Sequence, residues 1–197
     1  MKKTIIKTIC ITLAALIGIC VATYFIFAFA APKRLGDFLD GLNMHSLAIK
    51  NYERQYKKTN DNEDLYVLAS KIDEKNESAK AAKYLLILTE SPEFSDFCKT
   101  KDKAGKKITT EEFLCGKLSA ALTYDGEFSK AVQNAENYFN KNGYTSYNPF
   151  RIFIFELKSS LKDEQKIIVK TKLRSIYDGL TDETVKQTVA SDIDALG

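Results

Sequence analysis

The sequence predicts an all-α protein in which short amphipathic helices follow one long apolar helix. Residues 8–31 contain no charged side chain and are dominated by Ile, Leu, Ala, Val and Phe. After them, apolar residues recur at helical spacing, as at Leu65, Leu68, Ala69 and Ile72. The chain has three prolines and nine glycines, and its Lys-, Glu-, Ala- and Leu-rich stretches favour helix over sheet.

The apolar stretch 8–31 predicts a transmembrane helix behind a short basic segment, residues 1–7. About 22 residues with a rise of 1.5 Å each cross a hydrocarbon layer of about 30 Å. Basic residues stand on both sides of the stretch, with Lys2, Lys3 and Lys7 before it and Lys33 and Arg34 after it. The positive-inside bias favours, by a small margin, a single-pass signal-anchor in a bacterial cytoplasmic membrane, with the N-terminus inside and the C-terminal domain extracytoplasmic.

A cleaved signal peptide is the alternative for this segment. Ala28, Phe29 and Ala30 resemble a small-residue cleavage site. The apolar stretch is longer than the 7–15 residues typical of the apolar region of a signal peptide. The uncleaved anchor is therefore favoured.

Residues 65–92 predict two short helices separated by a polar turn at 75–78. The first carries one apolar stripe, and the second carries another at Ala81, Leu85 and Leu88 before Pro92 ends it. Helices of this length are too short to be stable alone, so the pair needs neighbours.

The same spacing returns on both sides of this pair. Upstream, Leu35 and Ala48 stand 33 residues before Leu68 and Ala81. Downstream, Ala131 follows Ala81 by 50 residues, after an insertion at about 95–110. In this third unit Gly126 allows a tight turn, and the small Ala131 lets two helices approach closely.

This pattern of a Leu-small pair, an Ala in the second helix and a closing Pro resembles the tetratricopeptide repeat (TPR) family. The resemblance covers about residues 32–145 and implies three TPR-like helical hairpins stacked as a solenoid. Residues 146–197 match the repeat poorly and are expected to be atypical C-terminal capping helices. A generic helical bundle with Ala at close crossings is the alternative fold.

The insertion between the second and third units is basic. Its lysines surround an Ala-Gly pair and have loop composition: Lys99, Lys101, Lys103, Lys106 and Lys107. A solvated loop is the favoured interpretation, and the alternative is a basic finger that contacts anionic lipid or an anionic wall polymer. A helix is expected to restart around residues 109–112, with a Thr as its N-cap and acidic residues in its first turn.

Cys98 and Cys115 stand at the two ends of the insertion. In an oxidising compartment a disulfide between them would close a loop worth roughly 3 kcal/mol. Cys115 also falls at an inward repeat position, where a buried free thiol would serve as well. Both alternatives stay open, with the free thiols favoured.

The last quarter of the chain predicts three helices. Phe150, Phe153, Ile154 and Leu157 make one apolar face, and Thr181 is expected to cap the final helix. The favoured interpretation is that these helices close the core. In the alternative, the cluster at 150–155 is an exposed docking stripe.

Residue patterns typical of catalysis or cofactor binding are missing from the sequence. We expect no enzyme activity, no catalytic residues, no cofactor and no metal, since no Cys or His pair has zinc-like spacing and no phosphate loop is present. His45, the single histidine, matches a turn position of the repeat and is expected to be structural. The small net charge of +3 argues against nucleic acid as a partner.

The resemblance implies that the first helix of each hairpin lines a concave groove. The residues that would line it are Asp37, Asp40, Tyr66, Ser70, Asp73, Phe113, Lys117 and Tyr124. Family members that clamp a peptide carboxylate need an Asn where Asp37 stands. A basic or aromatic peptide segment is therefore the expected ligand.

These features predict a membrane-tethered scaffold or adaptor that binds other proteins, themselves membrane-associated, through a peptide groove. The alternative is a passive structural subunit of a membrane complex. In that case the span and the C-terminal helices would make the contacts.

Overall fold

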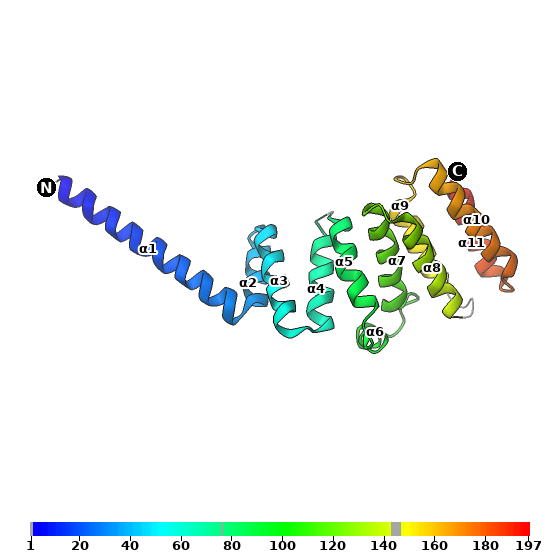
Figure 1. Cartoon of the computed structure of the whole chain (residues 1–197), viewed down its shortest axis with the longest axis horizontal. Helices are drawn as coiled ribbons and strands as arrows, with labels where there is room; N and C mark the ends of the chain where they lie inside the picture. Colours follow the sequence, from blue (N-terminus) through cyan, green and yellow to red (C-terminus); the bar gives the residue numbers. More distant parts are fainter. Residues whose placement is uncertain (1, 76, 143–146) are drawn as a thin grey trace. The chain divides into compact units, whose positions relative to one another are not determined.

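A computed structural model describes residues 2–75, 77–142 and 147–197, and these residues form eleven helices and no strand. The helices are α1 (Lys2–Ala30), α2 (Pro32–Gly41), α3 (His45–Thr59), α4 (Asn62–Asp73), α5 (Ser78–Thr89), α6 (Phe94–Lys101), α7 (Thr110–Tyr124), α8 (Phe128–Lys141), α9 (Asn148–Leu157), α10 (Asp163–Gly179) and α11 (Glu183–Ala195) (Figure 1). The predicted all-α class is confirmed. The predicted boundary between residues 145 and 146 lies outside the described residues.

The chain divides into two compact units, Met1–Leu68 and Ala69–Gly197. The boundary falls within α4, so the first half of that helix belongs to the first unit and the second half to the second. Each unit is described by itself below.

Helix α1 is uninterrupted (Figure 1), and its segment Ile5–Ala30 is long and apolar enough to cross a membrane, with a mean hydropathy of 2.5. Its most apolar window is not buried against any other part of the described chain. The segment begins three residues before the predicted start at residue 8 and ends one residue before the predicted end at 31. Such a helix needs an apolar environment that the protein itself does not provide.

In the first unit, α2 and α3 form a close hairpin. Gly36 makes this possible, because a Cβ at that position would lie 2.8 Å from Cε1 of Tyr52. Leu35 and Leu39 of α2 and Ala48 of α3 are buried, as the repeat spacing predicts. The Tyr52 ring is buried against this glycine, and the burial of its apolar surface stabilises the hairpin.

The second unit is built around α7, which packs against α5, α6, α8 and α9. Small residues allow this many neighbours: Gly116, Ser119, Ala120 and Ala121 are all buried on α7. The closest approach is at Gly116, where an added Cβ would lie 2.6 Å from Cβ of Ile152 on α9.

The hairpin of α7 and α8 follows its sequence prediction. Gly126 in the turn has φ +86°, a conformation that residues with a Cβ rarely adopt. Ala131 and Ala135 of α8 are fully buried. At the other end of α7, the Thr109 side chain accepts a hydrogen bond from the Glu112 amide, and the Glu112 side chain accepts one from the Thr109 amide. The predicted Thr N-cap is confirmed, and the structure assigns it to Thr109.

The basic insertion is not a loop throughout. Phe94–Lys101 is helix α6, which carries Lys99, so the loop prediction is wrong for that part and holds only after Lys101. Phe94 and Cys98, one turn apart, are buried and hold this short helix in place. Packing of this apolar pair overrides the loop composition of the surrounding lysines.

Phe150, Phe153, Ile154 and Leu157 are buried, as the favoured interpretation predicts. The alternative of an exposed stripe at 150–155 is therefore wrong, and of the apolar residues in that range only Phe155 is exposed. One prediction for the last quarter needs correction. The N-cap of α11 is Asp182 and not Thr181, since the Asp182 side chain accepts hydrogen bonds from two amides of the first turn.

The contact at Gly116 leads to a stability prediction. Gly116→Ala should lower the free energy of unfolding by about 2 kcal/mol, because overpacking against α9 outweighs the higher helix propensity of alanine. Gly179→Ala, where nothing lies within 4 Å of the added Cβ, is the matched control and should leave stability unchanged or slightly higher. Urea denaturation of the full chain in detergent, followed by circular dichroism, measures both. Equal stability of the two variants would contradict this role for Gly116.

Candidate functional site

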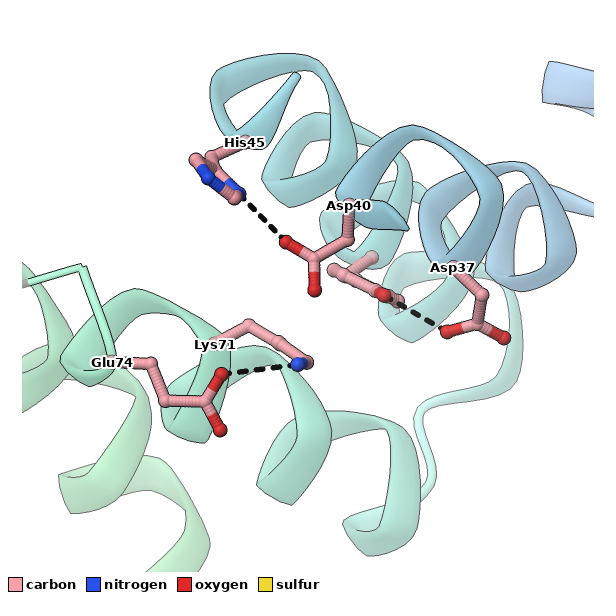
Figure 2. A network of polar contacts seen from close by, with 6 residues as sticks. Asp37, Asp40, His45, Lys71 and Glu74 are labelled. Carbon is pink, nitrogen blue, oxygen red and sulfur yellow. Dashed lines mark hydrogen bonds and ion pairs between the residues drawn. The ribbon is translucent and has the colours of Figure 1, made fainter. Parts of the chain in front are cut away.

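The predicted groove residues of the first unit are engaged by neighbours in their own hairpin. Asp37 accepts a hydrogen bond of 2.8 Å from the Tyr52 hydroxyl. Asp40 lies 2.8 Å from Nδ1 of His45, at the start of α3 (Figure 2). Both carboxylates therefore stabilise the hairpin of α2 and α3, and His45 has a structural contact as predicted.

Tyr66, the third predicted groove residue of this unit, is half-buried on the first half of α4. The same half-helix is tied to the end of α3 through Asp64, whose carboxylate accepts hydrogen bonds from Gln55 and Thr59 at 2.9 and 2.8 Å.

In the second unit the structure brings Asp73 and Lys117 together. Lys117 Nζ lies 2.7 Å from Asp73 Oδ2 and 3.2 Å from Glu156 Oε2. Asp73 also accepts a hydrogen bond of 2.7 Å from the Ser78 hydroxyl. One ammonium group thus lies between two carboxylates that come from α4 and α9.

The surroundings of Lys117 act on its pKa in two directions. Burial disfavours the charged amine and lowers the pKa, while the hydrogen bond and charge of Asp73, together with Glu156, raise it. The carboxylates prevail and the net shift is upward, so Lys117 stays protonated at neutral pH. The triad carries a net charge of −1.

Two exposed aromatic side chains share this part of α7. Phe113 is 43% exposed and Tyr124 is 48% exposed. Phe113 precedes Lys117 by one turn, and Tyr124 follows it by about two turns, so the three lie along one side of the helix. We call Asp73, Phe113, Lys117, Tyr124 and Glu156 the α7 face.

Of the predicted residues in this unit, Ser70 is half-buried on α4 and has no assigned contact with the α7 face. Lys71 and Glu74, on the same stretch of chain, pair at 3.0 Å (Figure 2). Lys71 and Glu74 are three residues apart, so their pairing is local to the end of α4.

Sequence reasoning missed Glu156. Its signal was present, because Glu156 is the one charged residue between Phe153 and Leu157 in an apolar helix, and Gly116 marks a helix crossing beside Lys117. An isolated acid on a buried helix next to a predicted crossing indicates an ion pair with the partner helix.

The two cysteines of the insertion are free buried thiols on α6 and α7. Burial, with the nearby Glu111 carboxylate, raises the pKa of each thiol to about 12. Neither thiol is therefore activated as a nucleophile. Pairing of Cys98 with Cys115 stays a prediction for an oxidising compartment.

A surface hollow of about 650 Å³ lies in the second unit. It is lined mainly by α5 and α8, with Leu86, Ile87, Gln133 and Asn137 among its walls. The repeat spacing predicts a groove along the first helices of the hairpins and does not predict this hollow. The exposed Leu86 and Ile87 on α5 were the available signal.

The described residues contain no group of three or more His, Cys, Asp or Glu side chains placed to hold a metal ion. Comparison of the chain with family models, with curated proteins and with solved structures finds no match. The likeness to TPR proteins therefore rests on the residue spacing alone.

The charge triad yields a second prediction. Lys117→Met should destabilise the protein by about 1–2 kcal/mol, because it leaves two partly buried carboxylates close together without a cation. Lys130→Met, which breaks an exposed pair with Glu127, should cost less than about 0.5 kcal/mol. Urea denaturation of both variants measures the difference, and similar losses would show that the triad is no stronger than a surface pair.

Asp192 on α11 provides a prediction on pH dependence. Burial raises the pKa of Asp192, opposed by the nearby Tyr147 hydroxyl and Arg151. Because the folded protein then binds a proton more tightly than the unfolded chain, stability should rise as pH falls from the raised folded-state pKa toward 3.8. Asp192→Asn should be more stable than wild type at pH 7, and this advantage should shrink in that acidic window.

Urea denaturation over a pH series measures the effect. Asp194→Asn, an exposed carboxylate on the same helix, is the control and should leave the wild-type pH profile unchanged. A constant difference between Asp192→Asn and wild type at every pH would contradict the assignment.

Proposed function

We propose that this chain is a membrane-tethered interaction protein that holds a peptide segment of partner proteins in a groove lined by first helices of TPR-like hairpins. The observation that carries the proposal is the α7 face, where exposed rings of Phe113 and Tyr124 flank the Lys117 triad. Exposed aromatic residues beside a partly buried charge network are the kind of surface on which binding hot spots are found.

The charge of the α7 face supports a basic or aromatic peptide as ligand. Lys117 is already neutralised by two carboxylates, so it offers little attraction to the carboxylate of a peptide C-terminus. The excess negative charge instead favours a Lys or Arg of the partner, with the two aromatic rings available for stacking.

The tether in this proposal is α1, in a single-pass arrangement with the N-terminus in the cytoplasm and the body outside a bacterial cytoplasmic membrane. The length and exposed apolar surface of α1 support the span. The lysines before the span support the orientation.

A second candidate, a structural subunit of a membrane complex, is favoured by apolar exposure on α10. Ile167 is 63% exposed, Ile168 is 46% exposed and Tyr177 is 37% exposed. In this candidate α10 and the span make the contacts.

Point variants separate the two candidates. Phe113→Ala with Tyr124→Ala should reduce capture of specific partners from membranes by at least about tenfold, because hot-spot aromatic residues carry about 2 kcal/mol each. Ile167→Ala with Tyr177→Ala removes a similar exposed apolar area on α10 and should leave capture unchanged. Affinity capture of the full chain from solubilised membranes, with partners quantified by mass spectrometry, provides the measurement.

If only the α10 variant loses capture of partners, the groove proposal is wrong and the structural-subunit proposal is supported. Equal capture of partners by wild type and the α7 variant would also contradict the groove proposal. Unchanged circular dichroism of both variants is expected, since all four side chains are exposed.

A further inference from the structure

A hollow of about 590 Å³ lies within the first unit, where the end of α1 meets α3. Its apolar wall consists of Phe25, Ala28, Phe29 and Pro32. Its remaining lining is basic and consists of Arg54, Lys57 and Lys58 of α3. Among the described residues no carboxylate lines this hollow, so it combines an apolar wall with a cationic rim.

The three cations come from one side of α3. They are spaced at i, i+3 and i+4, which places them on one helical face, and all three are exposed. Lys58 Nζ also donates to the Ala30 carbonyl at 3.4 Å, at the end of α1 where the last carbonyl groups lack helical partners. Arg54 uses one of its N–H groups on Asn51 at 3.3 Å, and a guanidinium group has five.

The apolar wall is continuous with the membrane-spanning segment. Ile5–Ala30 contains 26 residues and is about 39 Å long at 1.5 Å per residue, which exceeds a hydrocarbon layer of about 30 Å. Its last turns, with Phe25 and Phe29, therefore reach the level of the headgroups, where aromatic residues are enriched. Phe25 is 56% exposed and Phe29 is 84% exposed, so both present apolar surface at that level.

The chemistry of the two walls defines the occupant. A free anion would use only the rim, and a neutral lipid would use only the apolar wall. A molecule with a phosphate headgroup, a net negative charge and acyl chains would use both. We propose that this hollow binds an anionic phospholipid, with its phosphate between Arg54 and Lys57 and an acyl chain along Phe25 and Phe29.

This site is separate from the basic insertion at 99–107, which belongs to the second unit. The inference rests on the proposed role of α1 as a membrane span. It requires only that the leaflet next to α3 contains anionic lipid. Basic side chains at a membrane surface contribute about 1 kcal/mol each to such binding.

The test uses the full chain in a neutral detergent, titrated with phosphatidylglycerol or phosphatidylcholine and observed by native mass spectrometry. Wild type is expected to retain phosphatidylglycerol in preference to phosphatidylcholine. Arg54→Gln with Lys57→Gln should reduce that preference by at least about fivefold, since each removed cation is worth about that factor. This pair leaves the contact of Lys58 with α1 intact.

The matched control is Lys80→Gln with Arg174→Gln, which removes the same charge from exposed positions in the second unit. An equal loss of preference in the control would mean attraction by bulk charge, and an unchanged preference in the Arg54 and Lys57 variant would overturn the site. Phe25→Ala with Phe29→Ala should weaken phosphatidylglycerol retention as well. Retention that depends only on the cations, with inorganic phosphate competing equally well, would indicate a phosphate site and would overturn the lipid proposal.

Failure of the anchor itself is a separate outcome. Alkaline carbonate extraction of membranes leaves a spanning protein in the pellet. If wild type is extracted into the supernatant, α1 does not span the membrane, and the proposed lipid site is wrong as well. If wild type stays in the pellet and shows no preference for phosphatidylglycerol, only the lipid site is wrong.

Discussion

The second unit depends on how closely α7 approaches its neighbours. Gly116 allows α9 to lie against α7, with Ile152 in the space that a side chain would fill. On the α8 side, Asn134 donates hydrogen bonds to the Cys115 carbonyl and to the Ser119 hydroxyl, both at 2.9 Å. A polar side chain between closely packed helices is tolerated there because its donors are satisfied. Close contact on both sides fixes the rotation of α7 about its own axis.

That rotation determines which side chains of α7 meet other helices. Lys117 follows Gly116 directly, so the crossing that buries Gly116 brings Lys117 beside Glu156, one turn after Ile152 on α9. The rotation also leaves Phe113 and Tyr124 exposed. Packing and candidate binding surface are thus two results of one constraint. A substitution that pushes α9 away would also separate the charges.

Much of the fold could be predicted from local signals. The capping box at Thr109, the turn at Gly126 and the buried Leu and Ala positions follow from the chemistry of single turns, which the sequence displays directly. Helix α6 was missed because its stability comes from burial of Phe94 and Cys98 against other elements. The candidate site was harder to predict from the sequence. Gly116 and the isolated Glu156 indicate a helix crossing and an ion pair, but the sequence does not say which helix crosses α7 beside Lys117.

The acids of the first unit stay predicted groove residues, and the structure adds their neighbours. Within the α2–α3 hairpin Asp37 accepts a hydrogen bond from Tyr52, and Asp40 contacts the His45 ring. A repeat position predicts the side of a helix, and the neighbours in space decide which groups remain available to a ligand. In the second unit, Asp73 lies at a predicted groove position and forms an ion pair with Lys117 on the α7 face.

Only Ala31 separates the end of α1 from the start of α2, and its amide and carbonyl both continue helical hydrogen bonds, to Phe27 and from Leu35. A flexible linker of many residues would let a domain sample a wide volume above a bilayer, whereas a one-residue joint allows almost none. With α1 in a membrane, as proposed, the first hairpin would be confined to the membrane surface, and its effective concentration would be high only for segments that run within a short reach of the lipid. Partners with long juxtamembrane stalks would place their distal domains beyond it.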